Sequence, residues 1–186
     1  MSDERFIAGL ANLDTGGLAR LRRCAGQTLA ESGNVYDIFF RLIPGTPNAE
    51  WNQDMYFLVA TLYALTTRGS DQRRSGGGLS LGLALHGLRQ EQLAATGRST
   101  DDKISLDRRV AALLDADADQ LPFRLRQIVR LLHSHEQTLD WFKLLRDLLN
   151  WEHPNRFVQP RWAREYYIGR SAGSLNNQHT QKEATS

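Results

Sequence analysis

The chain has 186 residues, of which 41% are hydrophobic and 24% are charged, and its formal net charge is +2. This composition excludes a disordered chain, and the length suffices to bury a hydrophobic core. No apolar run reaches the roughly 18 residues of a membrane-spanning helix, and the start MSDERFIAGL lacks the apolar core of a signal peptide. The single cysteine, Cys24, excludes an internal disulfide. We therefore expect a cytoplasmic protein without a membrane partner.

The first part of the chain has the apolar spacing of several helices. We expect helices at about 4–12 and 17–31. Residues 35–43, VYDIFFRLI, could form a strand, but no second strand-like run can pair with it, so we interpret it as a short buried helix. PGTPN at 44–48 predicts a turn. The apolar positions of 51–68 nearly surround the segment, as in a helix at the centre of a core.

The second part of the chain begins with a glycine-rich basic loop at 68–78 and a short helix at 79–88. The polar stretch TGRSTDDK at 96–103 is the best candidate for a boundary between two groups of helices. Ser105 is the expected N-cap of the next helix, SLDRRVAALLDAD. Three more helices are expected in LPFRLRQIVRLLHS, TLDWFKLLRDLLNW and RFVQPRWAREYYI.

The fold class that these helices predict is all-α. We expect two small helical bundles in one compact chain, an N-terminal bundle at 1–98 and a C-terminal bundle at 99–170. The polar residues 171–186 are expected to form a disordered tail.

Helical geometry separates the arginines from the apolar stripes, because each residue advances the helix by roughly 100°. Arg20 and Arg23 are expected opposite the stripe of their helix, and Arg22 at its margin. Arg126 and Arg130, four residues apart, share one outward face. The side chains expected in the core are Leu18, Leu21, Ala25, Leu106, Val110, Leu113, Leu114, Leu125, Ile128, Val129, Leu131, Leu132, Trp141, Leu144, Leu145 and Leu148. Asp140, Lys143, Arg146 and Asp147 are expected outside it.

Arginine supplies nearly all of the positive charge, because lysine stands at only three positions. A GC-rich genome would explain this bias, and so would binding to phosphates, whose geometry a guanidinium matches well. Few of the arginines have a carboxylate four residues later, so we expect them to lack acidic partners and to face a polyanion. For any single arginine, a solvated surface charge is the commoner explanation. The candidate nucleic-acid-binding residues are Arg20, Arg22, Arg23, Arg73, Arg74, Arg108, Arg109, Arg126, Arg130, Arg161 and Arg164.

The candidates for catalysis are weak. His133 and His135 lie at an expected helix end, where a histidine more often caps carbonyl groups than binds a metal. GGGLSLG lacks the G-K-[ST] ending of a phosphate-binding loop, so we interpret it as a hinge. Cys24 has the position of a small core residue. We predict no enzyme, no catalytic residue, no metal and no cofactor; a metal-dependent enzyme at HSHE is a distant alternative.

Six stretches occur in an order and spacing that make a specific pattern, although each is a common helical pattern by itself. They are LDTGGLARLRR at 13–23, FFRLIP at 39–44, GLSLGLAL at 78–85, LDRRVAALLDAD at 106–117, RLLHSHEQTLDWFKLLRDLLNW at 130–151 and VQPRWAREYY at 158–167. Together they resemble the CasB family, the small subunit of the type I-E CRISPR surveillance complex called Cascade.

The resemblance implies a non-catalytic, all-α subunit that contacts the Cascade backbone and large subunits and a second copy of itself, head to tail. It also implies partners in the CRISPR RNA and both strands of the target DNA, with stabilisation of the R-loop and of the displaced non-target strand by charge. Val129 stands where relatives carry a second consecutive arginine, and Arg126 one turn earlier is its replacement. The residues that match the family's basic positions are Arg22, Arg23, Arg108, Arg109, Arg130, Arg161 and Arg164.

An alternative is a protein scaffold that binds no nucleic acid. In that case the arginines would contact acidic patches on neighbouring subunits.

Overall fold

The computed structural model describes residues 2–67, 78–99 and 102–169. Arg73, Arg74 and the expected tail therefore lie outside the described residues. Within these ranges the chain forms α-helices, one 3₁₀ helix and no β-strand, which confirms the all-α prediction. The elements are α1 (Ser2–Ala11), α2 (Thr15–Arg23), η1 (Gly33–Val35), α3 (Tyr36–Leu42), α4 (Pro47–Trp51), α5 (Gln53–Thr66), α6 (Leu81–Thr96), α7 (Ser105–Leu114), α8 (Leu121–Ser134), α9 (Trp141–Leu148) and α10 (Val158–Ile168).

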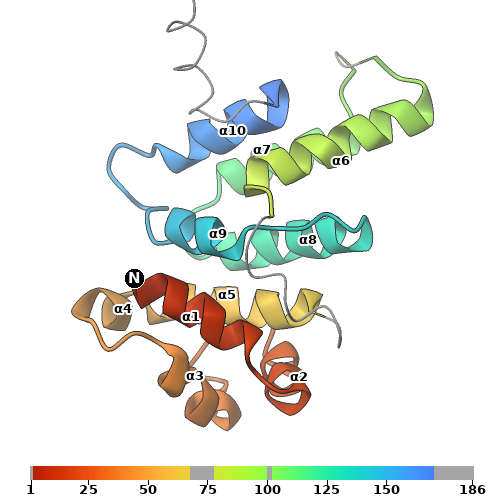
Figure 1. Ribbon diagram of the computed structural model, residues 1–186. Helices are drawn as coiled ribbons and strands as arrows, with labels where there is room; N and C mark the ends of the chain where they lie inside the picture. Colours follow the sequence, from red (N-terminus) through yellow and green to blue (C-terminus); the bar gives the residue numbers. More distant parts are fainter. Residues whose placement is uncertain (1, 68–77, 100–101, 170–186) are drawn as a thin grey trace, which may run out of the picture.

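The helices form two groups, α1 to α5 and α6 to α10, which we call the two layers; in the second, α8 and α9 lie next to the first group, and α6 and α10 lie beyond them (Figure 1). The helix α5 contacts α2 in its own layer and α8 and α9 in the other. The helix α6 packs along α10, although the sequence placed it in an N-terminal bundle at 1–98. The largest packing partner of α6 therefore comes from the expected C-terminal bundle.

The two layers share one hydrophobic core, and α5 lies at its centre. Its side chains are buried on nearly all sides, as the sequence predicts for this segment. The ring of Tyr63 on α5 meets that of Trp141 on α9, with the ring centroids 5.5 Å apart. On the other side, Phe57 meets Phe39 of α3 at the same distance. A helix buried against both layers explains why its sequence has no polar face.

Several helix ends differ from the prediction. The helix expected at 17–31 ends at Arg23, and the chain then passes through Gly26 with φ of +98°, a conformation that favours glycine. The expected turn at 44–48 is shorter because Pro47 begins α4, where the Thr46 hydroxyl accepts from the Ala49 N–H at 3.3 Å. The helix expected at 79–88 continues to Thr96.

The predicted N-cap at Ser105 is wrong by one residue. Ser105 is the first residue of α7, and Ile104 precedes the helix. The Asp107 carboxylate accepts from the Ile104 N–H at 2.7 Å. The helix therefore begins with a carboxylate of its first turn that bonds back to the chain before it.

The predicted core is confirmed for most side chains, including Leu18 and Leu21 on α2 and Ala25 just after it. Leu114 and Leu131 are half-buried. The prediction that Asp147 points outside is wrong, because its carboxylate is buried between α9 and α10. It accepts from the Trp162 indole at 2.6 Å and pairs with Arg161. This pairing satisfies a charge that burial would otherwise disfavour.

Gly78 and Leu79, at the end of the glycine-rich segment, pack against the chain around Leu139. Leu79 forms a bridge with Leu139, in which the Leu79 N–H donates to the Thr138 carbonyl at 3.1 Å and the Leu79 carbonyl accepts from the Asp140 N–H at 2.9 Å. A Cβ on Gly78 would collide with the backbone of Leu139. The glycine is therefore required by a close approach of two backbones.

Candidate nucleic-acid interface

Arg22 is bonded to the end of the central helix. Its Nε donates to the Ala64 carbonyl at 2.8 Å, and its Nη2 donates to the Thr67 carbonyl at 2.6 Å. The last carbonyl groups of a helix lack partners within the helix, and a cation there is favoured by the helix dipole. Arg22 therefore fastens α2 to α5, in agreement with its expected place at the margin of the buried stripe.

Two arginines of α8 follow: Arg130 lies close to the same end of α5, and Arg126 lies against the segment after α2. The guanidinium of Arg126 lies against Gly26. A Cβ atom at position 26 would collide with this guanidinium. Arg130, one turn later, is exposed and lines a cavity of about 940 Å³ together with Thr66 and Thr67 of the α5 end. We call Arg22, Arg126 and Arg130 the basic patch. The sequence placed Arg22 on one helix and Arg126 and Arg130 on another, and the fold brings Arg22 and Arg130 to one end of α5.

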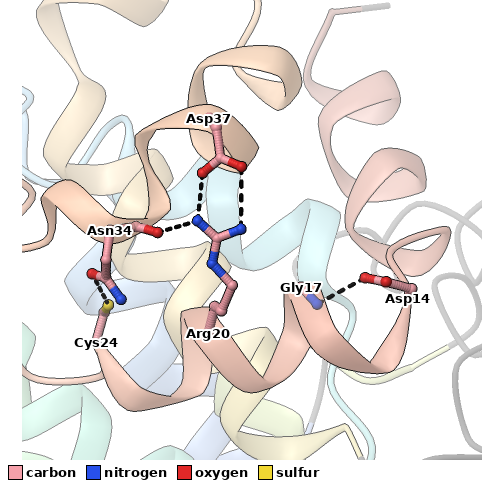
Figure 2. A network of polar contacts seen from close by, with 6 residues as sticks. All are labelled: Asp14, Gly17, Arg20, Cys24, Asn34 and Asp37. Carbon is pink, nitrogen blue, oxygen red and sulfur yellow. Dashed lines mark hydrogen bonds and ion pairs between the residues drawn. The ribbon is translucent and has the colours of Figure 1, made fainter.

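Arg20 is held by an acidic partner, as Figure 2 shows. Its two terminal nitrogens donate to the two carboxylate oxygens of Asp37 at 3.1 and 2.6 Å, and Nη2 also contacts the Asn34 carbonyl. The hydrogen bonds with Asp37 raise the pKa of Arg20, and they lower the pKa of Asp37. The prediction that Arg20 lacks an acidic partner is therefore wrong, because the carboxylate comes from α3 and not from its own helix.

A groove of about 670 Å³ lies between α2 and α3, and Arg20, Arg23 and Arg41 line it. Asp14 also lines it, and its carboxylate accepts from the Gly17 N–H at 2.7 Å as the N-cap of α2 (Figure 2). Arg23 and Arg41 are exposed, and neither has a hydrogen bond or ion pair with a described residue. We call this feature the α2–α3 groove.

Sequence reasoning missed Arg41. The residue lies in the segment interpreted as a buried helix, and only its place beside the expected turn indicated that it could reach solvent. Arg23, by contrast, lies on the outward side that helical spacing predicts.

The other candidate arginines lie in the second layer, on α7 and α10. Arg161 pairs with Asp147, so the prediction that it lacks an acidic partner is also wrong. Arg108, Arg109 and Arg164 are exposed and have no hydrogen bond or ion pair with the described residues. The structure does not bring these residues into the basic patch.

Acidic side chains gather at the opposite end of α5. Asp54 lies in the first turn of α5 and Glu50 in α4, which precedes it. Glu4 of α1 is nearby, because Asp3 accepts from the Tyr56 hydroxyl of α5 at 2.6 Å. Carboxylates therefore lie near the start of α5, and Arg22 and Arg130 lie near its end.

The polar residues singled out for chemistry have structural partners. His135 lies 3.3 Å from a carboxylate oxygen of Glu91, and the buried Cys24 thiol lies 3.5 Å from the Asn34 side-chain oxygen (Figure 2). In the part of the chain that the structure describes, no three residues that could hold a metal ion lie together, and no helix is long and apolar enough to cross a membrane.

These observations define a small, two-layer helical protein with arginines concentrated at one end of its central helix. Comparison with known proteins identifies its family: a family model described as CRISPR-associated protein Cse2 matches residues 17–167. The chain belongs to this CRISPR-associated Cse2 family, which confirms the resemblance to CasB.

Individual relatives agree with this assignment. A Cse2 protein of Thermus thermophilus is 39% identical over 127 residues, which cover 67% of this chain but only 64% of that relative. The crystal structure of M. ruber CasB superposes with a TM-score of 0.70 at 33% identity, covering 97% of this chain and 98% of that one. A chain of a CRISPR RNA-guided surveillance complex shares the fold, with a TM-score of 0.64 at 22% identity over 95% of this chain and 92% of that one.

Proposed function

We propose that this chain is a non-catalytic small subunit of a type I-E Cascade complex. It bridges the backbone and large subunits and a second copy of itself, and it stabilises the CRISPR RNA-guided R-loop by binding nucleic-acid backbones, including the displaced non-target strand. Membership of the Cse2 family supports the place in Cascade. The gathering of arginines around the end of α5 supports the binding of nucleic acid.

The observation that carries the proposal is that Arg23 and Arg130 are exposed without a hydrogen bond or ion pair to any described residue. A phosphate can replace solvent at such a guanidinium without breaking an internal ion pair, whereas Arg20 and Arg161 would first have to leave a carboxylate. Contacts of this kind read no sequence, which suits a subunit whose complex recognises its target by base pairing.

The test is the salt dependence of binding by the reconstituted complex. Wild type and Arg23→Ala plus Arg130→Ala are titrated with target DNA across a range of salt concentrations. Each lost phosphate contact lowers the slope of log affinity against log salt by about one, so we expect the double variant to lose affinity and about two units of slope.

A matched control removes the same charge elsewhere. Arg5→Ala plus Arg98→Ala changes two exposed arginines outside the basic patch and the groove. An unchanged slope in the first variant, or an equal change in both, contradicts the proposed role of Arg23 and Arg130.

A second candidate function is a scaffold that contacts only protein. The side chain of Trp51 at the end of α4 is 88% exposed, and tryptophan is enriched at protein interfaces. A gel-shift experiment with the isolated protein and nonspecific duplex DNA at low salt separates the two functions. A shift supports nucleic-acid binding, and no shift at high protein concentration supports the scaffold.

A further inference from the structure

Trp51, the last residue of the short helix α4, lies on the side of that helix away from the core. Its side chain is 88% exposed, whereas Ala49, two residues earlier, is fully buried. Two residues advance a helix by about 200°, so the two side chains lie on opposite faces of α4. The other three tryptophans, Trp141, Trp151 and Trp162, are at most 6% exposed. The chain therefore leaves one tryptophan in water, where burying its ring would be favourable.

The short helix that carries Trp51 is held at both ends and lies at the edge of the first layer (Figure 1). At its start, the Thr46 hydroxyl accepts from the Ala49 N–H at 3.3 Å. At its end, the side-chain amide of Asn52 donates to the Asn48 carbonyl at 2.7 Å and to the Asn48 side-chain oxygen at 3.2 Å. These bonds restrain the backbone on both sides of Trp51 before a partner binds, which lowers the conformational entropy lost on binding.

Two carboxylates flank Trp51 in the sequence. Glu50 precedes it and Asp54 follows it by three residues, so the length of the chain alone keeps both Cα atoms within about 11 Å of the Trp51 Cα. Both side chains are exposed, and neither carboxylate has a hydrogen bond or ion pair with a described residue. Carboxylates repel phosphates and attract cations, and an indole ring is the aromatic ring that binds cations best. The surface around Trp51 therefore suits a cationic partner and disfavours a nucleic acid.

We propose that Trp51, Glu50 and Asp54 form a docking surface for an arginine or lysine side chain of another protein subunit of Cascade. This inference rests on the proposed function and names a surface for its protein contacts, distinct from the arginines assigned to nucleic acid. The cation lies over the indole ring, and the two carboxylates neutralise its charge. Tryptophan is enriched among the residues that dominate the energy of protein interfaces, and charges at the rim raise the rate of association.

The test measures binding of the full chain to a Cascade assembly of CRISPR RNA, backbone and large subunits that contains neither DNA nor the small subunit. Loss of a tryptophan that anchors an interface weakens binding by about 30-fold, so Trp51→Ala should raise the dissociation constant by about that factor. Glu50→Gln plus Asp54→Asn should slow association at low salt. The difference between this double variant and wild type should vanish at high salt, because salt screens exposed charges.

Two controls make the result specific. Phe123→Ala removes a ring that is 65% exposed on α8, in the other layer, and should leave binding to the assembly unchanged. The affinity of Trp51→Ala for duplex DNA and its midpoint of thermal unfolding should both equal those of wild type, because the variant changes neither an arginine nor a buried side chain.

The docking surface is overturned if Trp51→Ala binds the assembly as tightly as wild type, or if the carboxylate variant associates at the wild-type rate. It is also overturned if Trp51→Ala weakens DNA binding, since a nucleic acid then covers the ring. Loss of only a dimer of the free chain, measured by sedimentation velocity, would overturn it too, since the occupant is then a second copy. A wild-type chain that does not bind the assembly would defeat the proposed function instead, and the two failures are therefore distinguishable.

Discussion

Three side chains, one each from α6, α7 and α10, form a hydrogen-bonded cluster in the second layer. Arg89 of α6 is only 6% exposed, and its Nε donates to an Asp107 carboxylate oxygen of α7 at 3.0 Å. The hydroxyl of Tyr166 on α10 donates to the same oxygen at 2.6 Å. Burial would raise the pKa of Asp107, but the hydrogen bonds from Tyr166, the Ile104 N–H and Arg89 outweigh it and leave the pKa below its ordinary value.

The first prediction at this scale concerns Tyr166→Phe. A hydrogen bond to a charged group contributes about 2 kcal/mol, so the free energy of unfolding at neutral pH should fall by about that amount. The stabilisation of a carboxylate with a lowered pKa is present above the ordinary value of about 4 and is lost as pH falls through the folded value. Tyr166→Phe raises that folded value, so the difference from wild type should shrink below about pH 4 in denaturant titrations.

Tyr167→Phe is the control, because this neighbouring side chain is half-exposed and its hydroxyl has no hydrogen bond with a described residue. Its free energy of unfolding should match wild type. A difference between Tyr166→Phe and wild type that stays constant with pH would contradict the role of Asp107.

The partners of individual arginines set the limit of what the sequence can predict. Helical spacing correctly put Arg23 outside, because the direction of a side chain depends only on its own helix. The carboxylates that hold Arg20 and Arg161 come from other helices, as Asp37 and Asp147 do. Such partners are fixed by tertiary packing, and a search four residues along the same helix cannot find them.

At the scale of elements, α6 packs closely against α10. Gly82 allows this approach, since a Cβ there would lie 2.6 Å from the Cβ of Glu165 and 2.8 Å from the Trp162 carbonyl. The Ser80 hydroxyl, just before α6, donates to the buried Glu165 carboxylate at 2.7 Å. Gly82 therefore allows α6 and α10 to pack closely, and the Glu165 carboxylate binds the residue that precedes α6.

Gly82→Ala should destabilise the protein even though alanine favours a helix. The added methyl group meets backbone and a buried side chain, and overpacking of this kind costs about 1–3 kcal/mol. We expect a lower midpoint of thermal unfolding by circular dichroism. Gly87→Ala on the same helix is the control, because its Cβ would meet only the Gln137 side chain at 3.4 Å or more. The control should be neutral or slightly stabilising, and equal effects of the two variants would contradict the packing role of Gly82.

The helices themselves were predictable because their apolar stripes are long and regular, as for α8 and α9. Their ends were less so. The helix predicted at 17–31 cannot continue through Gly26, whose φ is positive. A glycine in a sequence does not reveal the sign of its φ. The groove between α2 and α3 is a product of tertiary packing, since residues of both helices line it.

At the scale of the whole molecule, α5 ties the two layers into one core. Trp141→Ala would leave a cavity where Tyr63 of α5 meets α9, and loss of a buried tryptophan costs about 3–5 kcal/mol. We expect wild type and variant each to unfold in a single transition, with far-ultraviolet circular dichroism and tryptophan fluorescence coinciding. Trp51→Ala, at the exposed site, should leave the midpoint unchanged. Separate transitions for the two probes would indicate that the layers unfold independently.

The carboxylates near the start of α5 and the arginines Arg22 and Arg130 near its end form a local electric dipole. The helix has 14 residues, so its acidic and basic ends are separated by about 21 Å. The net charge of +2 attracts a polyanion only weakly, but the field of a polyanion exerts a torque on separated charges and turns the basic end toward itself. For the nucleic acid of the proposed function, we therefore expect added salt to lower the rate of association as well as the affinity.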